Sequence, residues 1–327
     1  MKIRYAALAA LTLGISAQTP VQPLNDLPQP YKTSRDWGKP PDNVPWAAVT
    51  AVEPGPGGIM YVIHRCNENS CANRPEPPIL KFDASGKLLK AWGQSMFTFP
   101  HGAFVDRDGN LWVTDSQAHQ VFKFNPDGKV LMTLGTAKTP SAAPGQFDEP
   151  TDVLVAPNGT IFITEGHSGG TPGNHRVSIF DKNGKFLKMF GKLGKGNGEL
   201  DAPHTIAMDS RGRLFVGDRN NNRIVIFDQD GKYLDQWKQW SRPSGITILA
   251  DDTMFVADSE SFGPDNPGWK KGIRIGSAKD GKPVSFIEDS ESTVIDHSGA
   301  EGVGVDAQGR VFGAVVRRKM LELHTKK

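Results

Sequence analysis

The 327-residue sequence has little excess charge and no apolar run long enough to cross a bilayer. Its 38 basic and 36 acidic side chains leave a formal net charge of +2, and the lysines and arginines are scattered. A nucleic-acid-binding protein is expected to gather positive charge into a patch or stripe. The apolar run Tyr5–Ile15 falls short of the roughly 20 residues that a transmembrane helix needs. The sequence therefore predicts neither a nucleic-acid partner nor a membrane span in the mature chain.

The N-terminus instead has the pattern of an export signal. Lys2 and Arg4 precede the apolar run, and Ser16–Ala17 supplies small residues for cleavage. We expect residues 1–17 to be a signal peptide and residues 18–30, which are rich in proline and glutamine, to be a flexible lead-in. The alternative is an uncleaved anchor. The prediction is a periplasmic or secreted protein.

Cysteine is scarce as well, since only Cys66 and Cys71 occur. Zinc sites built from cysteine need further Cys or His partners at set spacing, which this pair lacks. In an oxidising compartment, two cysteines this close together favour a local disulfide that pins one loop. We therefore predict a Cys66–Cys71 disulfide.

The sequence does contain an internal repeat, together with 36 glycines and 24 prolines. A phrase that begins at Pro100 (PHGAFVDRDGNLWVTD) returns at Pro150, Pro203, Pro243 and Ala300, with a degenerate copy from Ala47. Apolar residues alternate within each copy, and glycine-containing turns follow, as expected for antiparallel hairpins. Further strands follow, so that each unit of roughly 40 to 55 residues predicts four strands, the size of a propeller blade.

The two ends of the chain predict how the ring closes. The last repeat has only three strands, and the missing signature of a fourth strand occurs near the other end, at Asp36-Trp37-Gly38. We therefore predict an all-β, six-bladed β-propeller over residues 31–327, closed by an N-terminal strand that completes the last blade. A solenoid is the alternative, but it would not need a divided repeat.

Residues at the same position in successive repeats form a column at the mouth of the central channel. The second residue of the phrase is Ala48, His101, Thr151, His204, Ser244 and Glu301 in the six copies. His101, His204 and Glu301 occupy alternate blades, about 120° apart, and are expected to converge on the axis. Two imidazoles and a carboxylate with an open position suit zinc, and also iron or manganese. The alternative is histidines that hydrogen-bond around a water-filled channel.

A second column ends the next strand and carries Asp or Glu in the second to fifth blades, where we expect these carboxylates to bind turn amides. Arg65 and Arg219 stand beside this column where other repeats have Ser or Gly, and guanidinium groups suit carboxylate recognition. Surface salt bridges are the alternative. His167 begins a glycine-rich insertion and is a candidate general base.

These motifs resemble the NHL-repeat propellers and, among them, the peptidyl-α-hydroxyglycine α-amidating lyases. The similar stretches are Ile63-His64-Arg65, Phe99-Pro100-His101-Gly102, Trp112-Val113-Thr114-Asp115, His119-Gln120-Val121-Phe122-Lys123, Pro150-Thr151-Asp152-Val153, Pro203-His204 and Asp218-Arg219. The resemblance implies zinc held by three channel histidines and a reaction that splits a hydroxyglycine-extended peptide into an amide and glyoxylate.

By position, the resemblance makes His101 and His204 zinc ligands, Arg65 the substrate-facing arginine and Arg219 another active-site arginine. It also implies a calcium ion bound by main-chain carbonyls at positions like Thr50 and Ala103.

Three positions depart from the lyases. Glu301 stands in place of the third histidine, His167 in place of an active-site tyrosine, and Gly302 in place of the calcium aspartate. We predict a monomeric lyase that uses Zn²⁺ or another divalent transition metal, with a small-molecule or peptide substrate bearing a carboxylate. The alternatives are a metal-dependent lactonase or esterase and a non-enzymatic scaffold.

Overall fold

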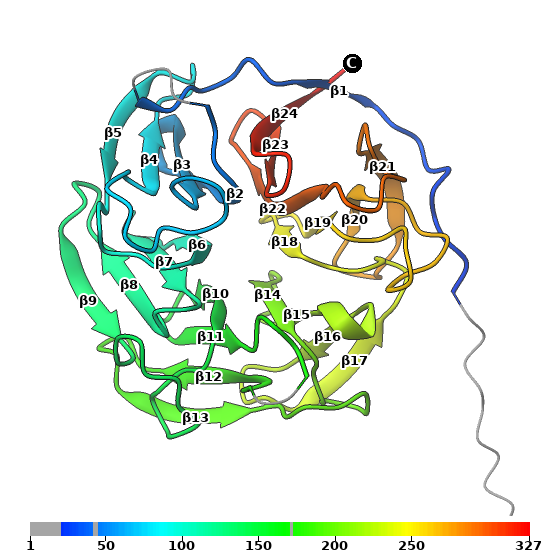
Figure 1. The fold of residues 1–327 in the computed structure, drawn as a ribbon. Helices are drawn as coiled ribbons and strands as arrows, with labels where there is room; N and C mark the ends of the chain where they lie inside the picture. Colours follow the sequence, from blue (N-terminus) through cyan, green and yellow to red (C-terminus); the bar gives the residue numbers. More distant parts are fainter. Residues whose placement is uncertain (1–20, 42–44, 171–172) are drawn as a thin grey trace, which may run out of the picture.

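A computed structural model describes residues 21–41, 45–170 and 173–327. The predicted signal peptide, residues 1–17, and the start of the predicted lead-in lie outside the described residues. The described chain forms six four-stranded antiparallel sheets arranged in a ring (Figure 1). This confirms the predicted six-bladed, all-β propeller. Within the described ranges, no helix is long and apolar enough to cross a membrane.

The strands follow one another blade by blade. The first blade contains β2 (Val49–Gly55), β3 (Ile59–His64), β4 (Ile79–Phe82) and β5 (Leu88–Trp92), and the second contains β6 (Pro100–Val105), β7 (Leu111–Asp115), β8 (Gln120–Phe124) and β9 (Val130–Leu134). The third contains β10 (Pro150–Val155), β11 (Ile161–Glu165), β12 (Arg176–Phe180) and β13 (Phe186–Phe190), and the fourth contains β14 (Pro203–Met208), β15 (Leu214–Asp218), β16 (Arg223–Phe227) and β17 (Tyr233–Trp237). The fifth contains β18 (Gly245–Ile248), β19 (Thr253–Asp258), β20 (Gly272–Ser277) and β21 (Pro283–Glu288). The sixth contains β22 (Ala300–Val305), β23 (Val311–Val315), β24 (Met320–Lys326) and β1 (Tyr31–Ser34). Short 3₁₀ turns, η2 (Pro56–Gly58) and η3 (Arg219–Asn221), connect strands.

The core lies between the blades. The alternating apolar residues of each sheet face the next sheet, and each pair of neighbouring blades shares one buried cluster. Between the first and second blades, for example, Trp92 packs edge-on against Tyr61 and Phe124, with ring centroids 6.1 and 6.4 Å apart. Because every blade buries both faces in this way, the ring forms a rigid frame around the central channel.

The N-terminal strand closes the ring as predicted. β1 pairs with β24, from Tyr31 opposite Lys326 to Ser34 opposite Leu323, and the two lie side by side at the outer edge of the last blade (Figure 1). The aromatic ring of Trp37, just beyond β1, packs against Phe82 of the first blade. The backbone hydrogen bonds of β1 therefore complete the last blade, and Trp37, which contacts both Phe312 of the last blade and Phe82 of the first, packs the two blades together.

The inner strands carry a bulge where the column residues lie. Pairing with the next strand slips after the first residue of the inner strand in the first, second, third, fourth and sixth blades. A bulge leaves a residue unpaired and re-aims its side chain. In the first blade Val49 pairs with His64 as Pro100 pairs with Asp115. The column residue of that blade is therefore Thr50, and the expectation of Ala48 was wrong by two positions, because the degenerate copy hides the register.

The carboxylates of the second column stabilise the turns, as expected. Asp115 accepts hydrogen bonds from the amides of Thr98, Phe99 and Ala118 at 2.6, 2.8 and 2.9 Å. Thr98 and Phe99 lie in the loop that leads into β6, and Ala118 lies in the loop between β7 and β8, so the buried carboxylate ties the backbone just before His101 to the next turn of the same blade.

Candidate metal centre

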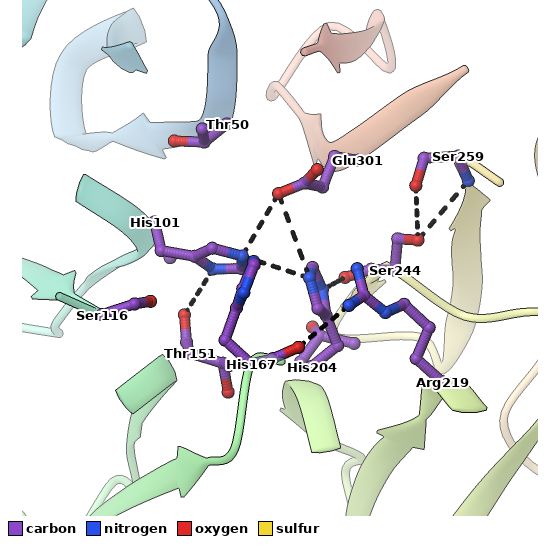
Figure 2. A network of polar contacts seen from close by, with 12 residues as sticks. Thr50, His101, Ser116, Thr151, His167, His204, Arg219, Ser244, Ser259 and Glu301 are labelled. Atoms are coloured by element: carbon purple, nitrogen blue, oxygen red, sulfur yellow. Dashed lines mark hydrogen bonds and ion pairs between the residues drawn. The ribbon is translucent and has the colours of Figure 1, made fainter. Parts of the chain in front are cut away.

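The three predicted ligands meet at one mouth of the channel (Figure 2). Nε2 of His101 on β6 lies 3.1 Å from Nε2 of His204 on β14 and 3.2 Å from Oε1 of Glu301 on β22. Nε2 of His204 lies 4.0 Å from the same oxygen. His167, in the loop after β11, completes the group, and one ligand atom from each of the four residues lies within 4.8 Å of the others.

The outer nitrogen of each channel histidine is bound to the backbone of the next blade. Nδ1 of His101 lies 2.8 Å from the carbonyl oxygen of Thr151, and Nδ1 of His204 lies 2.8 Å from that of Ser244. A carbonyl only accepts, so both Nδ1 atoms carry the proton and donate it. The two Nε2 atoms then present lone pairs toward one point, which is the arrangement that metal-binding imidazoles show.

The electrostatics of the cluster favour a bound cation. Burial lowers the pKa of His101, and it lowers that of His204 well below the usual range, so both rings are neutral near pH 7. Burial raises the pKa of Glu301, but His101 and the guanidinium of Arg65 outweigh it and hold this pKa well below the usual range. Oε1 of Glu301 is buried without a hydrogen bond within the described residues.

Neutral imidazole nitrogens and an ionised carboxylate oxygen are donors that zinc, iron and manganese accept. The residues present therefore fit a divalent transition metal. His101, His204 and Glu301 would hold it, and His167 offers a further ligand atom within 4.8 Å of theirs.

Arg65 lies beside this cluster and is held rigidly. It donates from Nε to the carbonyl oxygen of Pro100 at 3.2 Å and from Nη1 to Asn69 at 2.6 Å. Its guanidinium lies 3.6 Å from the ring centroid of Phe99. Nη2 lies 3.5 Å from Glu301 and is buried without a hydrogen-bond partner in the described structure. One guanidinium nitrogen therefore remains free to bind an acceptor at the cluster.

Arg219 approaches from the fourth blade. It donates from Nη2 to the carbonyl oxygen of His167 at 3.0 Å and lies 3.8 Å from Glu260. Arg65 is 2% exposed and Arg219 is 7% exposed. The alternative interpretation of both as surface salt bridges is therefore wrong, since both guanidinium groups are buried at the channel mouth.

His167 joins the cluster through the glycine-rich insertion. Its ring centroid lies 4.7 Å from that of His101 and 5.4 Å from that of Phe99. Burial, followed by repulsion between a protonated His167 and its neighbours His101 and Arg219, lowers the pKa of His167 well below the usual range. The ring is therefore neutral near pH 7 and has a lone pair to offer. The sequence predicted a general base here but did not predict that the ring would lie among the metal-ligating atoms.

The two cysteines form the predicted disulfide. Between them lies Asn69, the residue that binds Arg65, so the covalent link restricts the loop that orients this arginine.

The residues predicted for calcium lie deeper in the channel. Thr50 and Ala103 line a narrow cavity of about 40 Å³ beneath the histidines, together with Gly302. Calcium binding by their carbonyl oxygens stays a prediction. Two carboxylates that were not predicted as site residues, Glu53 and Asp152, line the same cavity. Asp152 could have been found, because it directly follows the column residue of the third blade.

Comparison with known protein families identifies two of the repeats. The NHL repeat family matches residues 97–124 and 200–227, and each matched segment contains one of the two channel histidines. The chain is therefore a propeller that contains NHL repeats, in its second and fourth blades.

Relatives of this NHL-repeat propeller include enzymes of peptide amidation. It is 40% identical over 152 residues to peptidyl-glycine alpha-amidating monooxygenase B of Xenopus laevis, a match that covers 44% of this chain and 17% of that protein. It is 35% identical over 172 residues to peptidyl-alpha-hydroxyglycine alpha-amidating lyase 1 of Drosophila melanogaster, covering 47% of this chain and 31% of that one. Human NHL repeat-containing protein 3 is 31% identical over 198 residues, covering 58% and 54%. The match spans less than two thirds of each relative.

Solved structures support the fold of the propeller. A streptogramin B lyase superposes with a TM-score of 0.61 at 14% identity, covering 91% of this chain and 98% of that one. A gluconolactonase from Xanthomonas campestris gives 0.62 at 14% identity, covering 94% and 98%. At such identities these likenesses establish the propeller alone.

Proposed function

We propose that the protein is an exported, metal-dependent lyase that breaks the C–N bond of an α-hydroxyglycine-type substrate and releases glyoxylate. The convergence of His101, His204 and Glu301 on one point, with Arg65 and Arg219 beside it, carries this proposal. The homology to proteins named as amidating lyases supports the reaction class. The disulfide suits export to an oxidising compartment.

In this proposal the arginines bind the carboxylate of the substrate. Among the described residues, Nη2 of Arg65 and Nε of Arg219 are both buried without a hydrogen-bond partner. Such donors gain most from a charged acceptor, because an unmatched buried donor is costly. A carboxylate placed between the two arginines would leave the α-carbon and its hydroxyl facing the histidines.

His101, His204 and Glu301 would hold the metal, which would polarise the hydroxyl or carboxylate oxygen of the substrate. His167 accepts the hydroxyl proton as the C=O bond of glyoxylate forms and the C–N bond of the carbinolamide breaks, and the imidazolium then returns this proton to the departing amide nitrogen. A neutral imidazole can take this role near pH 7. The products are a peptide amide, or a simpler amide, and glyoxylate.

The carboxylate of Glu301 makes the net charge of the metal and its ligands one unit more negative than three neutral histidines would. It offsets one unit of the ion's charge, which strengthens ion binding and weakens polarisation of the substrate compared with a third neutral imidazole. We therefore propose a substrate that ionises more readily than a simple hydroxyglycine peptide, or a slower reaction on the same substrate.

The test is release of glyoxylate from an N-acyl-α-hydroxyglycine by the purified monomer, measured before and after removal of metal with a chelator. Release that stops with the chelator and returns with Zn²⁺, Fe²⁺ or Mn²⁺ is the expected result. Glyoxylate release that is unaffected by complete metal removal, or no release with any metal, would refute the lyase. Hydrolysis of a lactone in the same preparations would favour the lactonase, which the carboxylate donor Glu301 also suits. Failure to bind any transition metal would favour the scaffold.

A further inference from the structure

A second cavity opens at the opposite end of the channel from the histidines. It has a volume of about 500 Å³, within the range of roughly 300–1,000 Å³ that small-molecule sites occupy. Each inner strand begins at the histidine end and finishes at this cavity; β6, for example, runs from Pro100 beside His101 to Val105 in the cavity wall. We call it the lower cavity. Nothing in the proposed lyase reaction uses it.

The wall of the lower cavity is apolar. It is formed by the last residues of successive inner strands, among them Phe104, Leu154, Met208, Ile248 and Val305. These side chains come from five different blades, so the apolar wall surrounds the axis rather than covering one side of it.

Two carboxylates, Glu53 and Asp152, lie at the inner end of the lower cavity. They line both this cavity and the narrow one beneath the histidines, so they stand where the channel narrows. Asp152 is held in place by donors: Oδ2 accepts from the hydroxyl of Thr205 at 2.9 Å and from the amide of Ile206 at 3.0 Å. Glu53 is partly buried and accepts no hydrogen bond within the described residues.

Among the described residues, no basic side chain in the lower cavity compensates the charge of Glu53 and Asp152. No lysine, arginine or histidine of the described chain lines the lower cavity. A third carboxylate in the wall, Asp209, is already paired with Arg213 at 2.8 Å. Burial and the neighbouring charge of Asp152 raise the pKa of Glu53 well above its usual range, and burial raises that of Asp152 to about 7. The inner end of the cavity therefore disfavours a second negative charge and would be stabilised by a cation.

We propose that the lower cavity binds a small organic cation, a protonated amine whose ammonium group meets Glu53 and Asp152 and whose apolar body fills the wall. The ammonium supplies the missing positive charge, and its N–H groups can donate to Glu53. A bare divalent ion is a poorer fit, because calcium takes about 6–8 oxygen ligands and the wall is mostly hydrocarbon. The apolar surface instead suits burial of a carbon skeleton.

The test compares three probes by isothermal titration calorimetry at pH 8: phenethylamine, 3-phenylpropionate and CaCl₂. We expect phenethylamine to bind once per chain and the isosteric carboxylate not to bind. Glu53→Gln should weaken amine binding at least tenfold, while Glu53→Asp, which keeps the charge, should bind within a few-fold of the wild type. Asp108→Asn is the matched control, because Asp108 lies in the exposed turn after β6 at the same end of the channel.

Thermal unfolding of each variant shows whether a loss of binding reflects a loss of fold. Equal binding of the amine and the carboxylate, or amine binding that survives Glu53→Gln, would overturn the proposal. So would calcium binding that is lost in Glu53→Gln without any amine binding, because it would assign the carboxylates to a metal. None of these results depends on lyase activity at the other end of the channel.

Discussion

Replacing Glu301 with glutamine tests the metal centre most directly. Glu301→Gln keeps the volume of the side chain but removes the one anionic donor, whose Oε1 lies 3.2 Å from Nε2 of His101 and 3.5 Å from Nη2 of Arg65. Metal affinity should fall by more than the roughly 10–100-fold that changes outside the ligand set cost. A shift of this size is readily measured by competition with a chromogenic chelator and by metal analysis of dialysed protein.

The same change should weaken the metal-free protein. At 3.5 Å and an effective dielectric constant of about 20, the Arg65–Glu301 attraction amounts to about 5 kcal/mol before desolvation. Removing one partner of a buried ion pair costs about 3–5 kcal/mol, because the other charge stays buried. The guanidinium remains charged, since burial lowers the pKa of Arg65 only to about 10. Chemical denaturation after chelation measures this loss.

Two further variants make the result specific. Glu260→Gln is the matched control, because Glu260 also pairs with buried arginines, at 3.8 Å from Arg219 and 3.1 Å from Arg242, but lies outside the group of metal-ligating atoms. It should leave metal affinity unchanged. Glu301→His should restore tight binding through a third neutral imidazole, with the net charge of the site one unit more positive than in the wild type. Wild-type metal affinity in Glu301→Gln would show that this carboxylate is not a ligand.

Three other outcomes are expected. His167→Ala should abolish glyoxylate release while metal content stays within a few-fold of the wild type; loss of the metal would instead make His167 a ligand. Replacing Cys66 and Cys71 with serine should lower the free energy of unfolding by about 2 kcal/mol, because the disulfide no longer restricts the unfolded chain by closing this short loop. An unchanged denaturation midpoint would contradict this. His324, 2.9 Å from the hydroxyl of Thr33, has its pKa lowered from 6.5 to about 4 by burial. Between pH 6.5 and pH 4 this histidine is protonated in the unfolded chain but not in the folded protein. The free energy of unfolding should therefore fall by about 3 kcal/mol as the pH drops from 6.5 to 4. Urea titrations at each pH should show a smaller fall for His324→Gln.

Much of the fold could be predicted because its interactions are local. The alternation of apolar residues and the turn glycines recur in every repeat, and four strands with short connections can pair in only one simple way. The exception was the first blade, where Thr50 and not Ala48 faces the channel. The copy of the phrase is degenerate there, so only the strand pairing, in which Val49 takes the place of Pro100, identifies the residue that faces the channel.

The site divides in the same way. His101, His204 and Glu301 could be predicted to converge, because equivalent positions in a closed ring must point to one axis. The place of His167 depends on the path of a long insertion, and no repeat constrains that path. Glu53 and Asp152 were missed because a carboxylate on an inner strand shows its uncompensated charge only when the opposite blades are in place.

The sequence by itself thus determined the blades, their number and the symmetry of the ligands, since these follow from a pattern repeated at short range. Only the tertiary structure decided which side chains from distant parts of the chain meet. Thr33 meets His324, 291 positions away, where the N-terminal strand completes the last blade. Arg65 meets Glu301 where the first and last blades adjoin, and Glu53 and Asp152 face a cavity that no basic side chain of the described residues lines. These contacts depend on how the ring closes, which no short stretch of the chain records.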